Sequence, residues 1–135
     1  MQEDWIRWEP LKGITGKYDV DYISDGKDGL VIKLYSETKE TKAINVVFKD
    51  YADTYRHTNE SFCFKVFGDL SEKYGAGFYG QWSFFKIINS DYVQWLSNQS
   101  CTYANEFTFI HFCFIGSDSI VDILARYEPI VTFLD

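Results

Sequence analysis

Alternating apolar and polar residues near the amino-terminal end of the chain predict a β-hairpin. Within residues 17–24, Tyr18, Val20 and Tyr22 fall on one face of an extended strand, because successive side chains of a strand point to opposite faces. The segment DGKDG at residues 25–29 follows directly. Asp-Gly pairs adopt the positive φ angles of tight hairpin turns at little cost, so this segment is predicted to reverse the chain.

The hairpin is expected to continue into a small sheet. Residues 30–37 form the returning strand, and the polar residues 38–41 form a second turn. Apolar residues return within residues 42–50, which predict a third strand. Residues 50–61 are polar and their pattern favours neither a helix nor a strand.

Residues 60–74 carry apolar side chains at helical spacing. Asn59 is a suitable cap for the start of this helix, and Gly75 would end it. An alternative interpretation makes residues 62–66 a short strand and leaves only the following residues helical, and periodicity does not separate the two. The apolar positions of the predicted helix are Phe62, Val66, Phe67, Leu70 and Tyr74.

A second helix is predicted after an apolar, strand-like run at residues 78–88. Asn89 or Ser90 can cap this helix, which should end near Ser100. It places four apolar side chains over one broad face. These are Tyr92, Val93, Trp95 and Leu96.

The carboxyl-terminal part of the chain is expected to supply the centre of the sheet. Residues 106–115 are apolar almost throughout, as is typical of a strand covered on both faces. After Gly116, Ser117 or Asp118 can cap a third short helix that Glu128 and Pro129 end. Its apolar residues are Ile120, Val121, Ile123 and Leu124, and residues 130–134 form a last strand.

These elements predict one α+β domain over residues 1–135. Three strands followed by alternating helices and strands favour a mixed or mostly antiparallel sheet of about six strands, with about three helices packed on it. A chain of 135 residues, 46% hydrophobic, can bury one sizeable core. Neither a linker nor an internal repeat is visible in the sequence.

The charge balance narrows the classes of partner. Twenty acidic residues against thirteen basic ones give a net charge of −7, which disfavours direct binding to nucleic acid or to an anionic membrane surface. The charged amino-terminal segment MQEDWIRWEP does not resemble a signal peptide, and no apolar run has the length of a membrane span. Three widely spaced cysteines, Cys63, Cys101 and Cys113, do not suggest a disulfide framework. We expect a cytoplasmic protein.

Motifs for catalysis or metal binding are missing from the sequence. The chain has two histidines and contains neither C-x-x-C nor H-E-x-x-H, so we expect no metal and no cofactor. His111 and Cys113 lie two residues apart, share one face of a predicted strand and could act as base and nucleophile with a third group. A packed histidine and a core thiol are the more common outcome, so no catalytic residue is assigned.

Acidic residues and aromatic residues together suggest a docking face. After Lys86 the chain has six acidic residues and one basic residue, Arg126, so this part carries −5 of the net charge of −7. Such a field attracts a basic partner, and large aromatic side chains anchor protein interfaces. The residues predicted to bind a partner are Asp91, Tyr92, Trp95, Asp118, Asp122, Tyr127 and Glu128.

Two segments carry a resemblance to known proteins. They are GQWSFFKIINSDYVQWLSNQS and IHFCFIGSDSIVDILARYEPIV, within residues 60–135. This part of the chain resembles small acidic bacterial proteins of unassigned function, some encoded near polymorphic toxins, where immunity proteins are expected. The resemblance implies a cytoplasmic inhibitor that occludes a toxin domain, and it assigns no role to any residue.

Two other classes of function stay open. One is a small ligand-binding protein or enzyme, with an aromatic pocket between sheet and helices lined by Trp82, Phe84, His111 and Cys113. The other is a structural subunit whose aromatic residues form a homodimer interface. A non-catalytic domain that binds another, basic protein is the first prediction.

Overall fold

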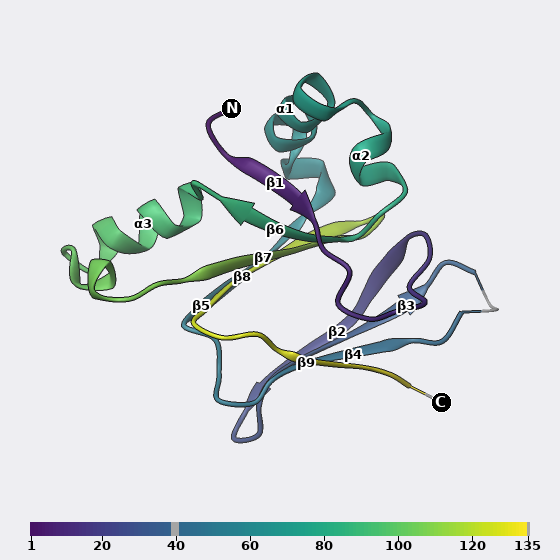
Figure 1. The fold of residues 1–135 in the computed structure, drawn as a ribbon, viewed down its shortest axis with the longest axis horizontal. Coiled ribbons are helices and arrows are strands. Elements are labelled where there is room, and N and C mark those ends of the chain that lie inside the picture. Colours follow the sequence, from purple (N-terminus) through teal and green to yellow (C-terminus); the bar gives the residue numbers. More distant parts are fainter. Residues whose placement is uncertain (39–40, 135) are drawn as a thin grey trace.

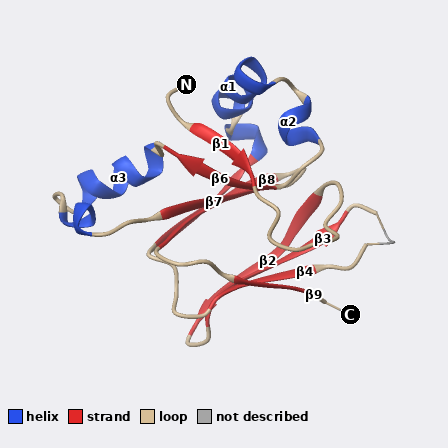
Figure 2. Ribbon diagram, in the orientation of Figure 1, coloured by secondary structure: helices blue, strands red, loops and turns tan. Residues whose placement is uncertain are grey.

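The computed structural model describes residues 1–38 and 41–134, whose strands form two antiparallel sheets (Figures 1 and 2). The five-stranded sheet has the order β1-β6-β7-β8-β5. Its strands are β1 (Asp4–Arg7), β6 (Phe84–Ile88), β7 (Ile110–Ile115), β8 (Ser119–Ala125) and β5 (Thr54–Asn59). The four-stranded sheet has the order β2-β3-β4-β9, with β2 (Tyr18–Gly26), β3 (Gly29–Ser36), β4 (Ile44–Phe48) and β9 (Ile130–Phe133).

The α+β class is therefore confirmed, with one difference in the sheets. The described residues contain nine strands in two sheets, where about six strands in one sheet were expected. Every strand pair is antiparallel. Three α-helices accompany the sheets in the described part of the chain, namely α1 (Phe64–Tyr74), α2 (Gly77–Gly80) and α3 (Asp91–Gln99), and two short 3₁₀ turns are η1 (Glu60–Phe62) and η2 (Tyr103–Glu106).

The main core lies between the two sheets. The rings of Tyr18 and Phe84 meet edge to face at 5.5 Å, and those of Phe48 and Phe112 at 5.3 Å, so each contact joins one sheet to the other. The buried members of this core are Ile14, Tyr18, Leu30, Ile32, Leu34, Ile44, Val46, Phe48, Phe84, Phe112, Phe114, Val121, Ile123 and Ala125. The two sheets thus form a sandwich with a shared apolar interior.

The other face of the five-stranded sheet carries the helices. In Figure 1, α1 and α2 lie above β1 and β6. Helix α3 lies at the left of the view, beyond the end of β6. A second core forms beneath α1 and α2 from Trp5, Cys63, Leu70, Phe85, Ile87, Cys113, Ile115 and Ile120. Strands β7 and β8 are consequently covered on both faces, one by the second sheet and the other by helices.

The amino-terminal hairpin is confirmed, but the face predicted for Tyr22 is wrong. Strands β2 and β3 pair from Tyr18 to Gly29, and a bulge interrupts their register between Val20 and Tyr22. The extra residue shifts the alternation by one position, because two residues of a bulged strand oppose one residue of its partner. Tyr22 is exposed, and Ile23 packs against the core in its place. Part of the predicted turn at residues 38–41, residues 39 and 40, lies outside the described residues.

The predicted third helix after Gly116 is wrong. Residues Ser119–Ala125 form strand β8, which pairs with β7 on one side and β5 on the other. All seven residues of β8 are buried. Both faces of this strand are covered, so apolar residues occupy both of its alternating sets of positions. The spacing of these apolar residues therefore matches that of a helix face as well. They are Ile120, Val121, Ile123 and Leu124.

Other elements differ less from the expectations. The helix at residues 60–74 is confirmed as η1 followed by α1, with the Asn59 side chain accepting a hydrogen bond from Ser61 N at 2.9 Å. The helix capped by Ser90 is confirmed as α3, which ends at Gln99. The strand-like run at residues 78–88 begins instead with a helical turn, α2. Strands β1 and β5 were not predicted, because edge strands exposed on one side carry polar residues.

Candidate functional site

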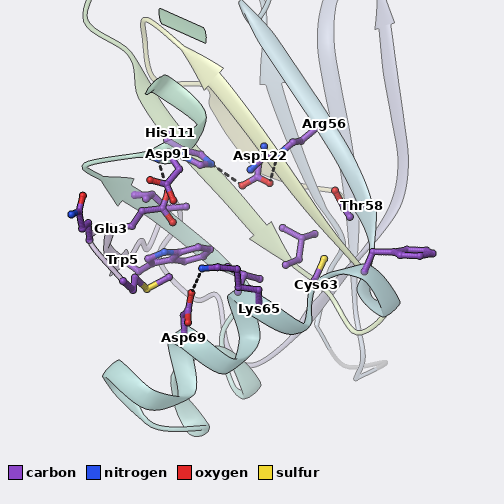
Figure 3. Close-up of a pocket in the computed structure, with 16 residues that line it drawn as sticks. Glu3, Trp5, Arg56, Thr58, Cys63, Lys65, Asp69, Asp91, His111 and Asp122 are labelled. Carbon is purple, nitrogen blue, oxygen red and sulfur yellow. Dashed lines mark hydrogen bonds and ion pairs between the residues drawn. The ribbon is translucent and has the colours of Figure 1, made fainter. Parts of the chain in front are cut away.

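A pocket of about 600 Å³ opens on the helical face of the five-stranded sheet (Figure 3). Strands β5, β7 and β8 form its floor, and the segment before β1, the start of α1 and the start of α3 surround it. Its lining residues are Met1, Gln2, Glu3, Trp5, Arg56, Thr58, Phe62, Cys63, Lys65, Val66, Asp69, Ile87, Asp91, His111, Ile120 and Asp122. Volumes of this size are common for sites that hold a ligand.

A chain of polar contacts crosses the floor of the pocket. His111 Nε2 lies 2.7 Å from Asp122 Oδ1, and His111 Nδ1 lies 2.6 Å from Ser90 Oγ. Arg56 Nε donates to Asp122 Oδ2 at 3.0 Å. Nε2–H donates to Asp122, because a carboxylate oxygen can only accept, and the Ser90 hydroxyl bonds the other ring nitrogen, Nδ1.

Asp122 is held as a buried carboxylate. Its exposed fraction is 6%, and that of His111 is 2%. Burial by itself raises the pKa of Asp122. Hydrogen bonds from His111 and Arg56, and electrostatic attraction to these two side chains, outweigh burial. The pKa of Asp122 therefore lies below its ordinary value. Arg56 also stacks over the ring of Tyr92 at 4.1 Å, and Tyr92 Oη lies 2.9 Å from Thr54 Oγ1.

The order Ser90, His111, Asp122 matches that of a nucleophile, a base and an orienting acid. Here the serine serves the helix instead, because Ser90 Oγ accepts from Val93 N at 3.1 Å and caps α3. The Asp91 amide donates to Glu3 Oε2 at 2.8 Å. Two of the first three amides of α3 are thus occupied and cannot stabilise an oxyanion. We interpret the chain of contacts as a structural tie between α3 and the sheet.

The pair His111 and Cys113 shares one face of β7, as the sequence indicates, but the two residues have different surroundings. Cys113 is completely buried beneath the helices, and burial raises the pKa of its thiol well above the ordinary value. The partners of His111 are Ser90 and Asp122. Phe84 belongs to the core between the sheets, on the opposite face, so it does not line the pocket with His111.

Two exposed phenylalanines lie where η1 ends and α1 begins, and one of them lines the pocket. Phe62 is 82% exposed and Phe64 is 78% exposed, and Phe62 lines the pocket. They flank Cys63, whose side chain is buried in the second core. Because residues on either side of a buried position point away from it at this start of a helix, both rings face solvent. We call Phe62 and Phe64 the phenylalanine patch.

Carboxylates gather next to this patch. Glu60 N donates to the carbonyl of Asp118 at 2.9 Å, which places the β7–β8 turn beside η1. In the same turn Ser117 N donates to Asp19 Oδ1 at 2.5 Å, and Ser117 Oγ bonds Glu37. We call Asp19, Asp21, Glu37, Glu60 and Asp118 the acidic edge. Its negative charge raises the pKa of the exposed Tyr35, with Asp19 as the largest cause.

The residues predicted to bind a partner do not form one surface. Asp91 and Asp122 line the pocket, and Tyr92 lies buried behind it. Trp95 is half exposed on α3, and Asp118 belongs to the acidic edge. The two others lie apart from these: Tyr127 packs on Phe48, and Glu128 pairs with Lys86.

Sequence reasoning missed Arg56, Trp5 and the exposure of the phenylalanine patch. The sequence contained one indication of this exposure. Phe62 and Phe64 flank Cys63, and the side chains of adjacent residues point in different directions, so a buried Cys63 side chain leaves its two neighbours pointing elsewhere. Nothing in the sequence places Arg56 beside Asp122, since the two residues meet only through the pairing of β5 with β8. In the described ranges, no three His, Cys, Asp or Glu side chains are grouped so as to hold a metal ion.

Comparison of the chain with family models, curated proteins and solved structures found no significant match. None of the helices within residues 1–38 and 41–134 combines the length and the apolar character that crossing a membrane requires. The fold and the site define an α+β sandwich with an open polar pocket.

Proposed function

We propose that this chain is a protein-binding domain that docks a basic partner on the phenylalanine patch and the adjacent acidic edge. The exposure of Phe62 and Phe64, at 82% and 78%, carries the proposal. Large apolar side chains that are exposed beside charged residues mark interaction sites, and burying one such ring is worth about 1.5 to 3 kcal/mol. A partner that covers both rings would gain a strong anchor.

The surrounding charge specifies the chemistry of the partner. Five carboxylates lie along the acidic edge, of which Asp21 pairs with Lys33 at 3.6 Å, in a chain whose net charge is −7. Complementary charge speeds encounter and disfavours wrong partners. An inhibitor that occludes a basic toxin domain, the function implied by the resemblance to immunity proteins, matches this chemistry. A second copy of the chain matches it less well, because two acidic edges would repel each other.

Replacing both rings tests the patch. The double variant Phe62→Ser/Phe64→Ser should keep its melting temperature, because neither side chain belongs to a core. Its affinity for the partner should fall about 100-fold, since two buried rings contribute roughly 3 kcal/mol or more. The partner is obtained by affinity capture from the cells that make the protein, purified, and titrated calorimetrically.

A matched control is Tyr103→Ser, which removes another exposed ring, 65% accessible, from η2. It should leave the affinity unchanged. If the captured partner is acidic, or if it binds the double variant as tightly as the wild type, the proposed docking surface is wrong. If wild-type protein instead self-associates and the double variant does not, the patch serves a homodimer.

Charge reversal on the acidic edge should act on the association rate. In the variant Glu60→Lys/Asp118→Lys we expect the association rate constant to fall about 10-fold at low salt, and its dependence on salt to flatten. Both residues are exposed, so stability should hardly change. Stopped-flow kinetics at several salt concentrations measures both quantities. An unchanged rate would remove electrostatic steering from the proposal.

A further inference from the structure

The pocket beside the phenylalanine patch carries charge that its own residues do not balance. Its acidic side chains are Glu3, Asp69, Asp91 and Asp122, and its cationic groups are Arg56, Lys65 and the amino-terminal ammonium of Met1, so four negative charges face three positive ones. Two pairs are internal: Arg56 with Asp122 at 3.0 Å, and Lys65 with Asp69 at 2.8 Å. Glu3 and Asp91 are left without a cationic partner among the described residues.

The two unbalanced acids lie side by side. The Asp91 backbone amide donates to Glu3 Oε2, which fixes Glu3 against the start of α3. The Asp91 carboxylate itself is exposed and makes no hydrogen bond or ion pair with the described residues. Both acids contribute to the raised pKa of Lys65, after its partner Asp69, so their negative field reaches the mouth of the pocket.

A second observation at the same place concerns Trp5. This residue lines the pocket, is 5% exposed, and lies among the other lining side chains in Figure 3. Its indole Nε1 is the one buried side-chain nitrogen or oxygen, within residues 1–38 and 41–134, that lacks a hydrogen-bond partner. Buried donors are nearly always paired, so an unpaired donor on a side chain that lines a pocket is a group to which a bound molecule can supply an acceptor.

We propose that this pocket receives an arginine or lysine side chain of the partner, with the cation at Glu3 and Asp91 and a carbonyl of the same segment at Trp5 Nε1. The inference rests on the proposed function and names the group that the partner contributes. Apolar walls from Val66, Ile87 and Ile120 suit the aliphatic stem of such a side chain.

The position of Phe62 favours a side chain of a bound protein over a free small molecule. Phe62 lines the pocket and is also half of the phenylalanine patch, so one bound segment would cover both. An anion suits the pocket poorly, because it would meet Glu3 and Asp91. The proposed contact is therefore continuous with the docking surface and adds charge specificity to it.

A peptide titration on the full chain tests the inference. The probe is the blocked pentapeptide acetyl-Gly-Ala-Arg-Ala-Gly-amide, and its control carries citrulline, which has the same shape without the charge. We expect the arginine peptide to shift the indole N–H resonance of Trp5 and the amide resonance of Asp91 in NMR spectra. The citrulline peptide should shift both at least 10-fold less at the same concentration.

Two variants locate the contact. Asp91→Asn should weaken peptide binding about 10-fold, while Asp28→Asn, the same charge change in the β2–β3 turn, should not weaken it. Trp5→Phe keeps an aromatic ring and removes the unpaired donor, so it should bind the peptide more weakly; the smaller ring leaves space in the second core, so its melting temperature should fall, and binding is compared well below that temperature. The missing indole resonance of this variant also assigns the Trp5 signal.

Several results would overturn the inference: equal shifts with citrulline, shifts that leave Trp5 and Asp91 unmoved, or unchanged binding by Asp91→Asn. The outcomes separate the two proposals. Loss of partner affinity in Phe62→Ser/Phe64→Ser without an arginine effect at Trp5 would refute the pocket and leave the docking surface standing. Arginine binding at Trp5 with no effect of the double serine variant would refute the docking surface and leave the pocket as a site.

Discussion

Replacing Asp122 by alanine should lower the free energy of unfolding by about 1 to 3 kcal/mol, the usual cost of leaving a buried hydrogen-bond donor without an acceptor. Asp122 Oδ1 accepts from His111 Nε2, and the variant leaves this buried donor without an acceptor, whereas the half-exposed Arg56 can bond water instead. His111 cannot turn to water, because it is 2% exposed. Urea denaturation followed by circular dichroism measures the change.

Two further variants show whether pairing or packing causes the loss. Asp118→Ala, in the exposed turn before the same strand, should change stability by less than about 0.5 kcal/mol. The double variant His111→Phe/Asp122→Leu should recover most of the stability, since replacing both partners of a buried hydrogen bond by apolar groups of similar shape is often nearly neutral. A double variant as unstable as Asp122→Ala would show that the shape of the site, and not its charge, is what matters.

The same carboxylate should leave a signature in the pH dependence of stability. The pKa of Asp122 in the folded protein lies below its ordinary value of 3.8. Below pH 3.8 the unfolded chain therefore binds this proton first, and the stability that Asp122 contributes is lost as the pH falls through the folded pKa. The difference in unfolding free energy between the wild type and Asp122→Asn should shrink as the pH falls below 3.8. A constant difference would contradict the lowered pKa.

The second large effect is expected at a glycine of the amino-terminal hairpin. Gly29 has a φ angle of +98°, and a Cβ atom placed there would lie 2.2 Å from the carbonyl oxygen of Phe48. That oxygen belongs to the backbone of the neighbouring strand and cannot move without breaking the pairing of β3 with β4. We expect Gly29→Ala to cost on the order of 3 kcal/mol, from backbone strain and steric overlap together.

The same turn contains a suitable control. Gly26 pairs with Gly29, and a Cβ atom at Gly26 would meet no atom within 4 Å. Gly26→Ala should therefore change the melting temperature by little, and reduced freedom of the unfolded chain offsets part of any loss. Thermal unfolding of both variants makes the comparison. Equal effects at the two glycines would mean that the β3–β4 contact does not constrain Gly29.

Local patterns in the sequence were sufficient where the structure depends on neighbouring residues. The hairpin of β2 and β3, the cap at Asn59 and the helix that begins after Ser90 were predicted because turns and caps are formed by residues a few positions apart. A central strand was also predicted, at residues 106–115, since a strand covered on both faces is apolar throughout, and the structure has it at Ile110–Ile115.

Periodicity failed where burial on two faces or a bulge changed it. Strand β8 resembled a helix because its inward residues on both faces are apolar, and Tyr22 was assigned to the wrong face because a bulge at Asp21 shifts the register. Division of the strands into two sheets depends on which strands pair, and pairing joins residues far apart in the chain. No local pattern contains that information.

For the candidate site, the sequence by itself determined the acidic balance and the chemistry of each side chain, including the aromatic residues near position 62. Only the tertiary structure decided which side chains meet. Asp122 was predicted on a partner-binding surface, but the pairing of β8 between β5 and β7 buries it against Arg56 and His111. The exposure of Phe62 and Phe64 was decided in the same way, because Cys63 occupies the only inward position between them and leaves both rings to solvent.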